Sequence, residues 1–353
     1  MSYPMDIRLV TVLLPIALLG ASGAPATEPS RAFLTTAFAL SAVEIGHLDR
    51  GEVISRTLDV NNRREIATLG IVRIDTLPSK YVERLTDITA FKRTEGIIQI
   101  GLFSSVPQLS DVASLTVDDA ELKRLRDCRV DDCGVRLPAA AIERIRREID
   151  WSDADASRKA TALVRQLLVD YVVRYRRGGA GAAMEYANRE PRLQVGREFA
   201  ALLEGDTVTA TYAPRLRRHL LDYPASAAEK MTDFVYWSKE MVRGRPVISL
   251  THVAIAAATD DSPVAYAVGS KQIYAAHYYD ASLGLTLLVP DRRPASTATF
   301  VVYLNRSRID LFDGMFGGVA RRLVAGRART LVAEQLQRLQ RVMATPAPAQ
   351  LKP

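Results

Sequence analysis

Residues 271–280 combine aromatic, basic and acidic side chains at a spacing that suits ligand binding. If this segment is a β-strand, alternate side chains point to opposite faces, so His277 and Tyr279 share one face and Tyr274 lies on the other. Aromatic walls with a few polar groups are the usual composition of a ligand pocket. We therefore predict that Tyr274, His277 and Tyr279 bind a ligand. The alternative is a core strand whose Tyr and His side chains are hydrogen-bonded inside the protein.

Two arginines, Arg306 and Arg308, come shortly before a glycine-rich stretch at residues 314–318. A pair of guanidinium groups can hold a carboxylate or a phosphate through bidentate hydrogen bonds. We predict that these two arginines also bind a ligand. The alternative is a structural ion pair with Asp310 or Asp313 inside the protein.

Known catalytic motifs are absent from the sequence, which contains no G-x-S-x-G, H-E-x-x-H or S-x-x-K pattern. None of its histidines has a partner at the spacing of a metal-ligand motif. We therefore assign no catalytic residue, no metal and no cofactor. An enzyme that uses His277 with Tyr274 or Tyr278 as acid and base is kept as an alternative.

The two cysteines, Cys128 and Cys133, are separated by four residues. This spacing differs from the C-x-x-C of redox motifs, and two thiols without a histidine pattern make a poor zinc site. In an oxidising compartment the pair would form a local disulfide, which is our prediction.

The N-terminus has the features of a secretory signal peptide. An apolar run at residues 9–19 is followed by small residues that end in Ala24-Pro25-Ala26, the A-x-A pattern of a cleavage site. The run is shorter than the roughly 20 residues that a membrane-spanning helix needs. We predict cleavage after residue 26 and a periplasmic or secreted protein, with a retained membrane anchor as the alternative.

The periodicity of the apolar residues divides the remaining chain into four parts. Residues 27–105 predict an opening helix at 31–47, strands at 53–60, 65–74 and 96–103, and a short helix at 79–88. Residues 106–245 show helical spacing and predict a large helical insertion. Residues 246–343 predict four strands joined by short connections, hence an antiparallel meander, and a long amphipathic helix at 319–343. The Pro/Ala-rich tail at 344–353 is expected to be disordered.

Positive charge is concentrated at the C-terminus of this chain of formal charge +7. From Gly314 onward Glu334 is the single acidic residue, against seven basic ones: Arg321, Arg322, Arg327, Arg329, Arg338, Arg341 and Lys352. A basic amphipathic helix suits an anionic membrane surface, whereas nucleic acid is a poor partner for an exported protein. The alternative is the ordinary solvated side of a helix.

The order of these elements resembles the helix-grip fold of START-like lipid-transfer and ligand-binding proteins. The resemblance covers residues 52–104 and 247–343 and includes the segment Leu77-Pro-Ser-Lys-Tyr-Val-Glu-Arg-Leu-Thr-Asp87, the meander and the closing helix. It implies an α+β fold in which the long helix grips a curved antiparallel sheet, with a hydrophobic ligand between them. The helical insertion departs from the usual START-like pattern.

Shorter segments resemble uncharacterised exported bacterial proteins of no known activity: the Cys128-x4-Cys133 spacing, Tyr236-Trp237-Ser238-Lys239, residues 271–278 and residues 305–308. Three hypotheses follow for the function. The first is a periplasmic protein that binds or transfers a hydrophobic or lipid-like molecule. The second is an enzyme that acts on such a molecule in the same pocket. The third is an envelope scaffold that contacts an anionic membrane or a partner protein.

Overall fold

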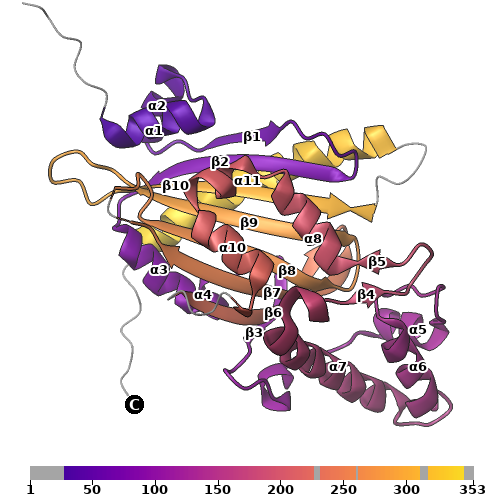
Figure 1. Cartoon of the computed structure of the whole chain (residues 1–353). Helices are drawn as coiled ribbons and strands as arrows, with labels where there is room; N and C mark the ends of the chain where they lie inside the picture. The colour runs from indigo at the N-terminus through magenta and orange to yellow at the C-terminus, as the bar shows by residue number, and fades with distance from the viewer. Residues whose placement is uncertain (1–27, 226–230, 260, 311–316, 346–353) are drawn as a thin grey trace, which may run out of the picture.

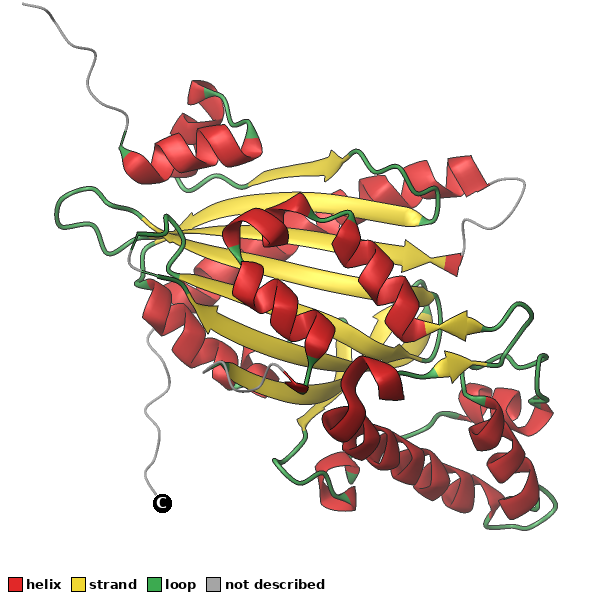
Figure 2. Cartoon of the chain, viewed as in Figure 1, coloured by secondary structure: helices red, strands yellow, loops and turns green. Residues whose placement is uncertain are grey.

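A computed structural model describes residues 28–225, 231–259, 261–310 and 317–345 (Figure 1). The predicted signal peptide and residues 346–353 of the predicted tail lie outside these ranges. The fold is α+β, as the sequence predicts, and consists of one large open antiparallel sheet with helices on both faces (Figure 2).

The sheet has eight strands in the order β1-β2-β10-β9-β8-β7-β6-β3, with every neighbouring pair antiparallel. Its strands are β1 (Ile54–Leu58), β2 (Glu65–Ile74), β3 (Ile97–Leu102), β6 (Thr232–Val242), β7 (Arg245–Ala257), β8 (Tyr266–Ala275), β9 (Tyr279–Pro290) and β10 (Thr299–Ile309). From β7 to β10 the chain forms the predicted four-stranded antiparallel meander, which returns to β2, and β6 adds a fifth consecutive strand to it.

Helices α3 (Pro78–Thr86) and α4 (Ile88–Phe91) connect β2 to β3 at the far edge of the sheet. They share a face with the long C-terminal helix α11 (Gly317–Ala344), which the sequence predicts closely. Helix α11 packs on β2, where Gly70 has no side chain to hold it away: a Cβ at this position would lie 2.6 Å from Leu336 Cδ1. The contact at Gly70 therefore fixes how closely α11 approaches the sheet.

The opposite face of the sheet is covered by α1 (Pro29–Phe38), α2 (Ala42–Asp49), α8 (Val195–Glu204) and α10 (Pro214–Asp222) (Figure 1). Alternate residues of β10 show how the two faces divide. Phe300 and Val302 belong to the apolar core beneath these helices, whereas Val301 belongs to the core beneath α11. The sheet is thus the middle layer of three.

Between β3 and β6 the chain leaves the sheet and forms most of its short helices. The elements of this inserted region are η1 (Leu109–Val112), α5 (Asp119–Asp127), α6 (Ala139–Glu148), α7 (Ala156–Gly178), η2 (Gly179–Ala182), β4 (Glu185–Tyr186), β5 (Leu193–Gln194) and α9 (Thr207–Tyr212), together with α8 and α10. Cys128 and Cys133 form the predicted disulfide after α5. Since α8 and α10 lie on the face opposite α11, these two helices do not cover the α11 side of the sheet.

Two boundaries differ from the prediction. Residues 232–242 form β6 of the sheet, although their sequence context predicts that they belong to a helical insertion ending at 245. Successive side chains of this segment point to opposite faces of the sheet, as in any β-strand: Trp237 packs toward the inserted region and Tyr236 toward α3 and α4. The single opening helix is in fact two, because Ala39 adopts a left-handed conformation (φ 50°) between α1 and α2.

No helix within the described ranges is both long and apolar enough to cross a bilayer.

Candidate functional site

The segment predicted to be one ligand-binding strand is a tight hairpin. Strand β8 ends at Ala275, Tyr278 has a positive φ of 66°, and β9 begins at Tyr279. A β-bulge in β8 also shifts its register with β7, because Leu250 pairs with Tyr274 and Thr251 with Gln272, which leaves Ile273 as the extra residue. The predicted alternation across residues 271–280 is therefore wrong, because the chain reverses within it.

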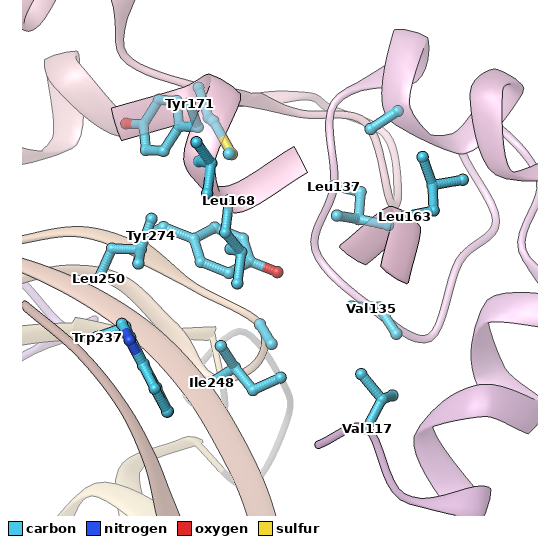
Figure 3. Packing of buried hydrophobic residues seen from close by; sticks show 14 of the residues in the cluster. Val117, Val135, Leu137, Leu163, Leu168, Tyr171, Trp237, Ile248, Leu250 and Tyr274 are labelled. Carbon is cyan, nitrogen blue, oxygen red and sulfur yellow. The ribbon is translucent and has the colours of Figure 1, made fainter. Parts of the chain in front are cut away.

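Tyr274 and His277 hold the inserted region on the sheet. Tyr274 is buried and meets the ring of Tyr186 edge-on, with 6.1 Å between the ring centroids. Figure 3 shows it close to Leu250 of the sheet. His277, also buried, places Nε2 2.8 Å from Glu121 Oε1 of α5. His277 thus has a hydrogen-bonded partner inside the protein, as in the alternative, whereas Tyr274 has an aromatic contact.

Arg306 and Arg308 lie in β10 and point toward α8. Arg306 donates from Nε to Glu65 Oε1 at 2.7 Å, and Arg308 donates from Nη1 to Glu198 Oε2 at 2.9 Å. They are thus in structural ion pairs, but with other acids than the two that the sequence indicates. Asp310 pairs instead with Arg136, and Asp313 lies outside the described residues. Both carboxylates come from elements distant in the sequence. Pairing of β10 with β2 brings Glu65 to Arg306, and the docking of α8 brings Glu198 to Arg308.

These pairs belong to a larger ionic network at one end of the sheet. Asp280, which is 1% exposed, accepts a hydrogen bond from Arg136 at 2.7 Å and another from Arg64 at 3.0 Å. Burial raises the pKa of Asp280, and the two arginines offset this only in part. The network contains four basic and four acidic residues: Arg64, Arg136, Arg306 and Arg308 with Glu65, Glu198, Asp280 and Asp310. Its charges are matched within the protein.

On the α11 side, part of the sheet presents polar instead of apolar side chains. We call this area the polar face and define it by Ser238, Glu240, Ser249, Thr251, Ser282, Thr286, Tyr303, Asn305 and Ser307, which strand register places on one side of β6, β7, β9 and β10. Its members bond to one another, as Ser282 does to Ser307 at 2.8 Å. Of the five predicted ligand residues, Tyr279 is the one beside this area, in a small apolar group with Ile309 and the first half of α11.

Lys92 reaches the polar face from the C-terminus of α4. Its Nζ donates to Tyr236 Oη at 2.9 Å and lies 3.6 Å from Glu240 Oε1. Burial opposes the charge of Lys92, but Tyr236 and Glu240 more than compensate, so its pKa is raised and the side chain is an ammonium. The Lys92 and Glu240 side chains remain 35% and 33% exposed. A desolvated but accessible cation therefore lies beneath the helices.

Two tyrosines share this environment. Burial raises the pKa of Tyr279 to about 12, with Glu240 and Tyr303 adding to the effect. Burial also raises the pKa of Tyr303. Both phenols are desolvated, although both residues are only half-buried by surface area. The sequence pointed to Tyr279 but not to Lys92, Tyr236 or Tyr303, because no local spacing links them.

A second polar group lies on the opposite face, where His219, Asp233 and His252 place one ligand atom each within 4.8 Å of one another. Burial lowers the pKa of His252. Burial alone would raise the pKa of Asp233, but the two histidines hold it well below its ordinary range. These are the residues that can hold a metal ion. They come from α10, β6 and β7, so the sequence contains no ligand motif to show them.

Comparisons with known proteins identify no family. No protein-family model and no curated protein matches the chain. Among solved structures, TTHA0849 from Thermus thermophilus aligns with 16% sequence identity and a TM-score of 0.24, covering 33% of this chain and 74% of that one. A TM-score this low supports no statement about fold or function.

Proposed function

We propose that the protein binds an amphipathic small molecule between the sheet and α11. The observation that carries this proposal is the environment of Lys92, Glu240, Tyr279 and Tyr303. Neighbouring atoms desolvate the lysine and both tyrosines, yet all four side chains keep accessible surface. We infer that these side chains line a space between the sheet and α11 that a small molecule can enter.

The connectivity of the sheet supports the START-like resemblance drawn from the sequence. The chain runs from β2 through α3 and α4 to β3 at the other edge, returns by the meander and closes with α11. In START-like proteins the ligand lies between that closing helix and the sheet. Helices α8 and α10 of the inserted region lie on the other face of the sheet, away from α11.

The surrounding side chains indicate the chemical class of the ligand. The hydroxyl groups of the polar face and the Lys92 ammonium suit a polar or anionic head group. Tyr81, Val253 and Val268 belong to the adjoining apolar core and suit a hydrocarbon body. We therefore propose that the hydrophobic or lipid-like ligand expected from the sequence also carries an anionic head group. The Cys128–Cys133 disulfide agrees with the proposed periplasmic or secreted location.

Native mass spectrometry with lipid extraction tests the proposal on gently purified protein. We expect one co-purifying amphipathic molecule per chain, and binding of oleate to the emptied protein. Lys92→Met should weaken oleate binding by about tenfold or more, since it removes a charge-assisted hydrogen bond. Lys80→Met, at an exposed lysine of α3, is the matched control and should bind normally. An empty protein that binds no oleate would contradict the proposal.

The outward side of α11 favours a second, peripheral role. Arg322, Arg327 and Arg329 are exposed there, and Leu323 between them is 71% exposed. We propose that this surface contacts anionic lipid, each arginine contributing about 1 kcal/mol. Vesicles of phosphatidylglycerol should bind the protein at low salt and release it at high salt, because salt screens exposed charges. Equal binding to neutral vesicles would contradict this role.

A further inference from the structure

The group His219, Asp233 and His252 lies on the α8/α10 face of the sheet, away from the proposed ligand space. The sheet itself brings two members together. His252 of β7 pairs with Val235 of β6, so Asp233 lies two residues along the neighbouring strand on the same face. Helix α10 crosses this face and places His219 above them, with Leu216 and Leu220 packed against Gly269. Three separate elements thus direct one donor atom each to the same point.

The distances suit a shared cation better than direct hydrogen bonds. His219 Nε2 lies 3.6 Å from Asp233 Oδ2, and His252 Nε2 lies 3.7 Å from Asp233 Oδ1. An N–H···O hydrogen bond needs about 2.7–3.2 Å. Donors bound to one tetrahedral zinc ion lie about 3.3 Å apart, given zinc–ligand bonds of about 2.0–2.1 Å. The two imidazoles face different oxygens of Asp233, and one donor atom from each residue lies within 4.8 Å of the others, so the donors would have to approach by at most about 1.5 Å to share one ion.

The second ring nitrogen of His252, Nδ1, has the kind of hydrogen-bond partner that metal-binding histidines have. Its Nδ1 lies 2.9 Å from Tyr175 Oη, while its Nε2 is buried without a hydrogen-bond partner among the described residues. Histidine ligands usually donate their second ring N–H to such an outer partner, which leaves the first nitrogen able to bind the ion.

The three side chains differ in exposure, and the group is open to solvent on one side. His219 and His252 are 1% and 0% exposed, but the Asp233 side chain is 29% exposed. Solvent therefore reaches the group on the side of the carboxylate. Lys271 of β8 pairs with His252 across the two strands. Its Nζ donates a hydrogen bond to the Leu220 carbonyl oxygen at 2.8 Å. A closed structural zinc site has four protein ligands, whereas three protein ligands leave a position for water or another ligand.

We infer that His219, Asp233 and His252 form a binding site for a divalent transition metal of the zinc class, with Tyr175 positioning His252 and one coordination position open to solvent. Two imidazoles and one carboxylate are donors that such ions accept. Tyr223 forms part of the surroundings: its ring centroid is 4.5 Å from that of His252, and it also lines a shallow depression of about 430 Å³. A molecule in this depression would lie next to the site.

Metal titration of the full-length protein tests the inference. After dialysis against a chelator, Zn²⁺ is added in competition with a chromophoric chelator, and Co²⁺ is added separately to record its absorption spectrum. We expect one equivalent of Zn²⁺ to bind and a visible Co²⁺ spectrum of low coordination number. No saturable binding of either ion would overturn the inference and leave the histidines as partners of Asp233 only.

Matched variants locate the site. His219→Gln, Asp233→Asn and His252→Gln should each weaken Zn²⁺ binding by more than about 100-fold, and Tyr175→Phe by about 10–100-fold. His277→Gln removes another buried, acid-paired histidine and should bind normally. Circular dichroism of the metal-free variants reports folding, and the partly exposed Asp233→Asn decides the matter if a histidine variant unfolds. Zn²⁺ binding that survives Asp233→Asn would overturn the assignment.

Discussion

The two faces of the sheet are built on different principles, although the same strands form both. Beneath α1, α2, α8 and α10 most residues are apolar or are paired in a matched ionic network around Asp280, and the group His219, Asp233 and His252 is the exception. Beneath α11 the apolar core covers part of the sheet, and the polar face with Lys92 covers the rest. Closely packed, fully paired interiors serve stability. Accessible polar groups within a protein cost stability and indicate a binding role.

This difference suggests that separate parts of the chain provide stability and ligand binding. The inserted region and the N-terminal helices give the sheet a tightly packed support. The α11 side keeps accessible polar groups, among them Lys92 and Glu240. If this is correct, substitutions should cost stability on the packed face, whereas on the polar face they should mainly change ligand binding.

The largest effect is expected from Asp280→Asn on the packed face. Removing this carboxylate deprives Arg64 and Arg136 of the buried acid that they share and leaves Arg136, whose side chain is 5% exposed, with the partly exposed Asp310. Breaking a buried ion pair in this way costs about 3–5 kcal/mol. Chemical denaturation measures the loss, with Asp155→Asn at a surface pair as a control that should change nothing measurable. A loss below about 1 kcal/mol would mean that the network does not support this face.

A pH-dependent loss is expected at Asp291, which attaches α1 to the same face through Arg31. Burial alone would raise the pKa of Asp291, but hydrogen bonds from Arg293, Arg31 and Ser296 hold it well below 3.8, its ordinary value. Its stabilisation is therefore present above that pH and is lost as the pH falls. Asp291→Asn should cost about 1.5–3 kcal/mol at pH 7. The difference in unfolding free energy between the unmodified protein and Asp291→Asn should narrow below pH 3.8. A difference that does not change with pH would contradict this prediction.

On the α11 side, two glycines distinguish the packed area from the polar face. Gly70→Ala should cost about 1–3 kcal/mol, because the new methyl group collides with Val332 and Leu336 of α11. Gly284→Ala should have little effect, since its Cβ would meet Tyr303 Oη at 3.4 Å and Ser270 Cβ at 3.5 Å. Thermal unfolding of both variants measures the contrast. Equal losses would show that the polar face is as closely packed as the contact at Gly70.

The smallest effect is expected on the outward side of α11. Glu334 faces Arg327 at 3.8 Å, with side chains 54% and 66% exposed. Such a pair contributes at most about 0.5 kcal/mol, so Glu334→Gln should leave stability nearly unchanged. The variant should bind anionic vesicles slightly more tightly, since it removes a negative charge. A marked loss of stability would show that this side of α11 packs against something.

The sequence predicted the elements whose signals are local. Period-two alternation identified the strands of the meander, and a helical stripe of apolar residues identified α11 almost to its ends. The spacing of Cys128 and Cys133 predicted their disulfide. These features depend on residues close together in the chain, which is why they can be found without the fold. The same alternation is present in β6, but the helical character of the preceding residues obscured it.

The tertiary structure alone decided how distant residues meet. A tight turn at Tyr278 and a bulge in β8 changed the faces on which the residues of the predicted pocket lie. Strand pairing gave Arg306 its carboxylate, and α4 directed Lys92 to the polar face. The meeting of His219, Asp233 and His252 required a helix and two strands. Such contacts depend on strand register and helix docking, which are set by the packing of the whole core, and no local spacing in the sequence encodes them.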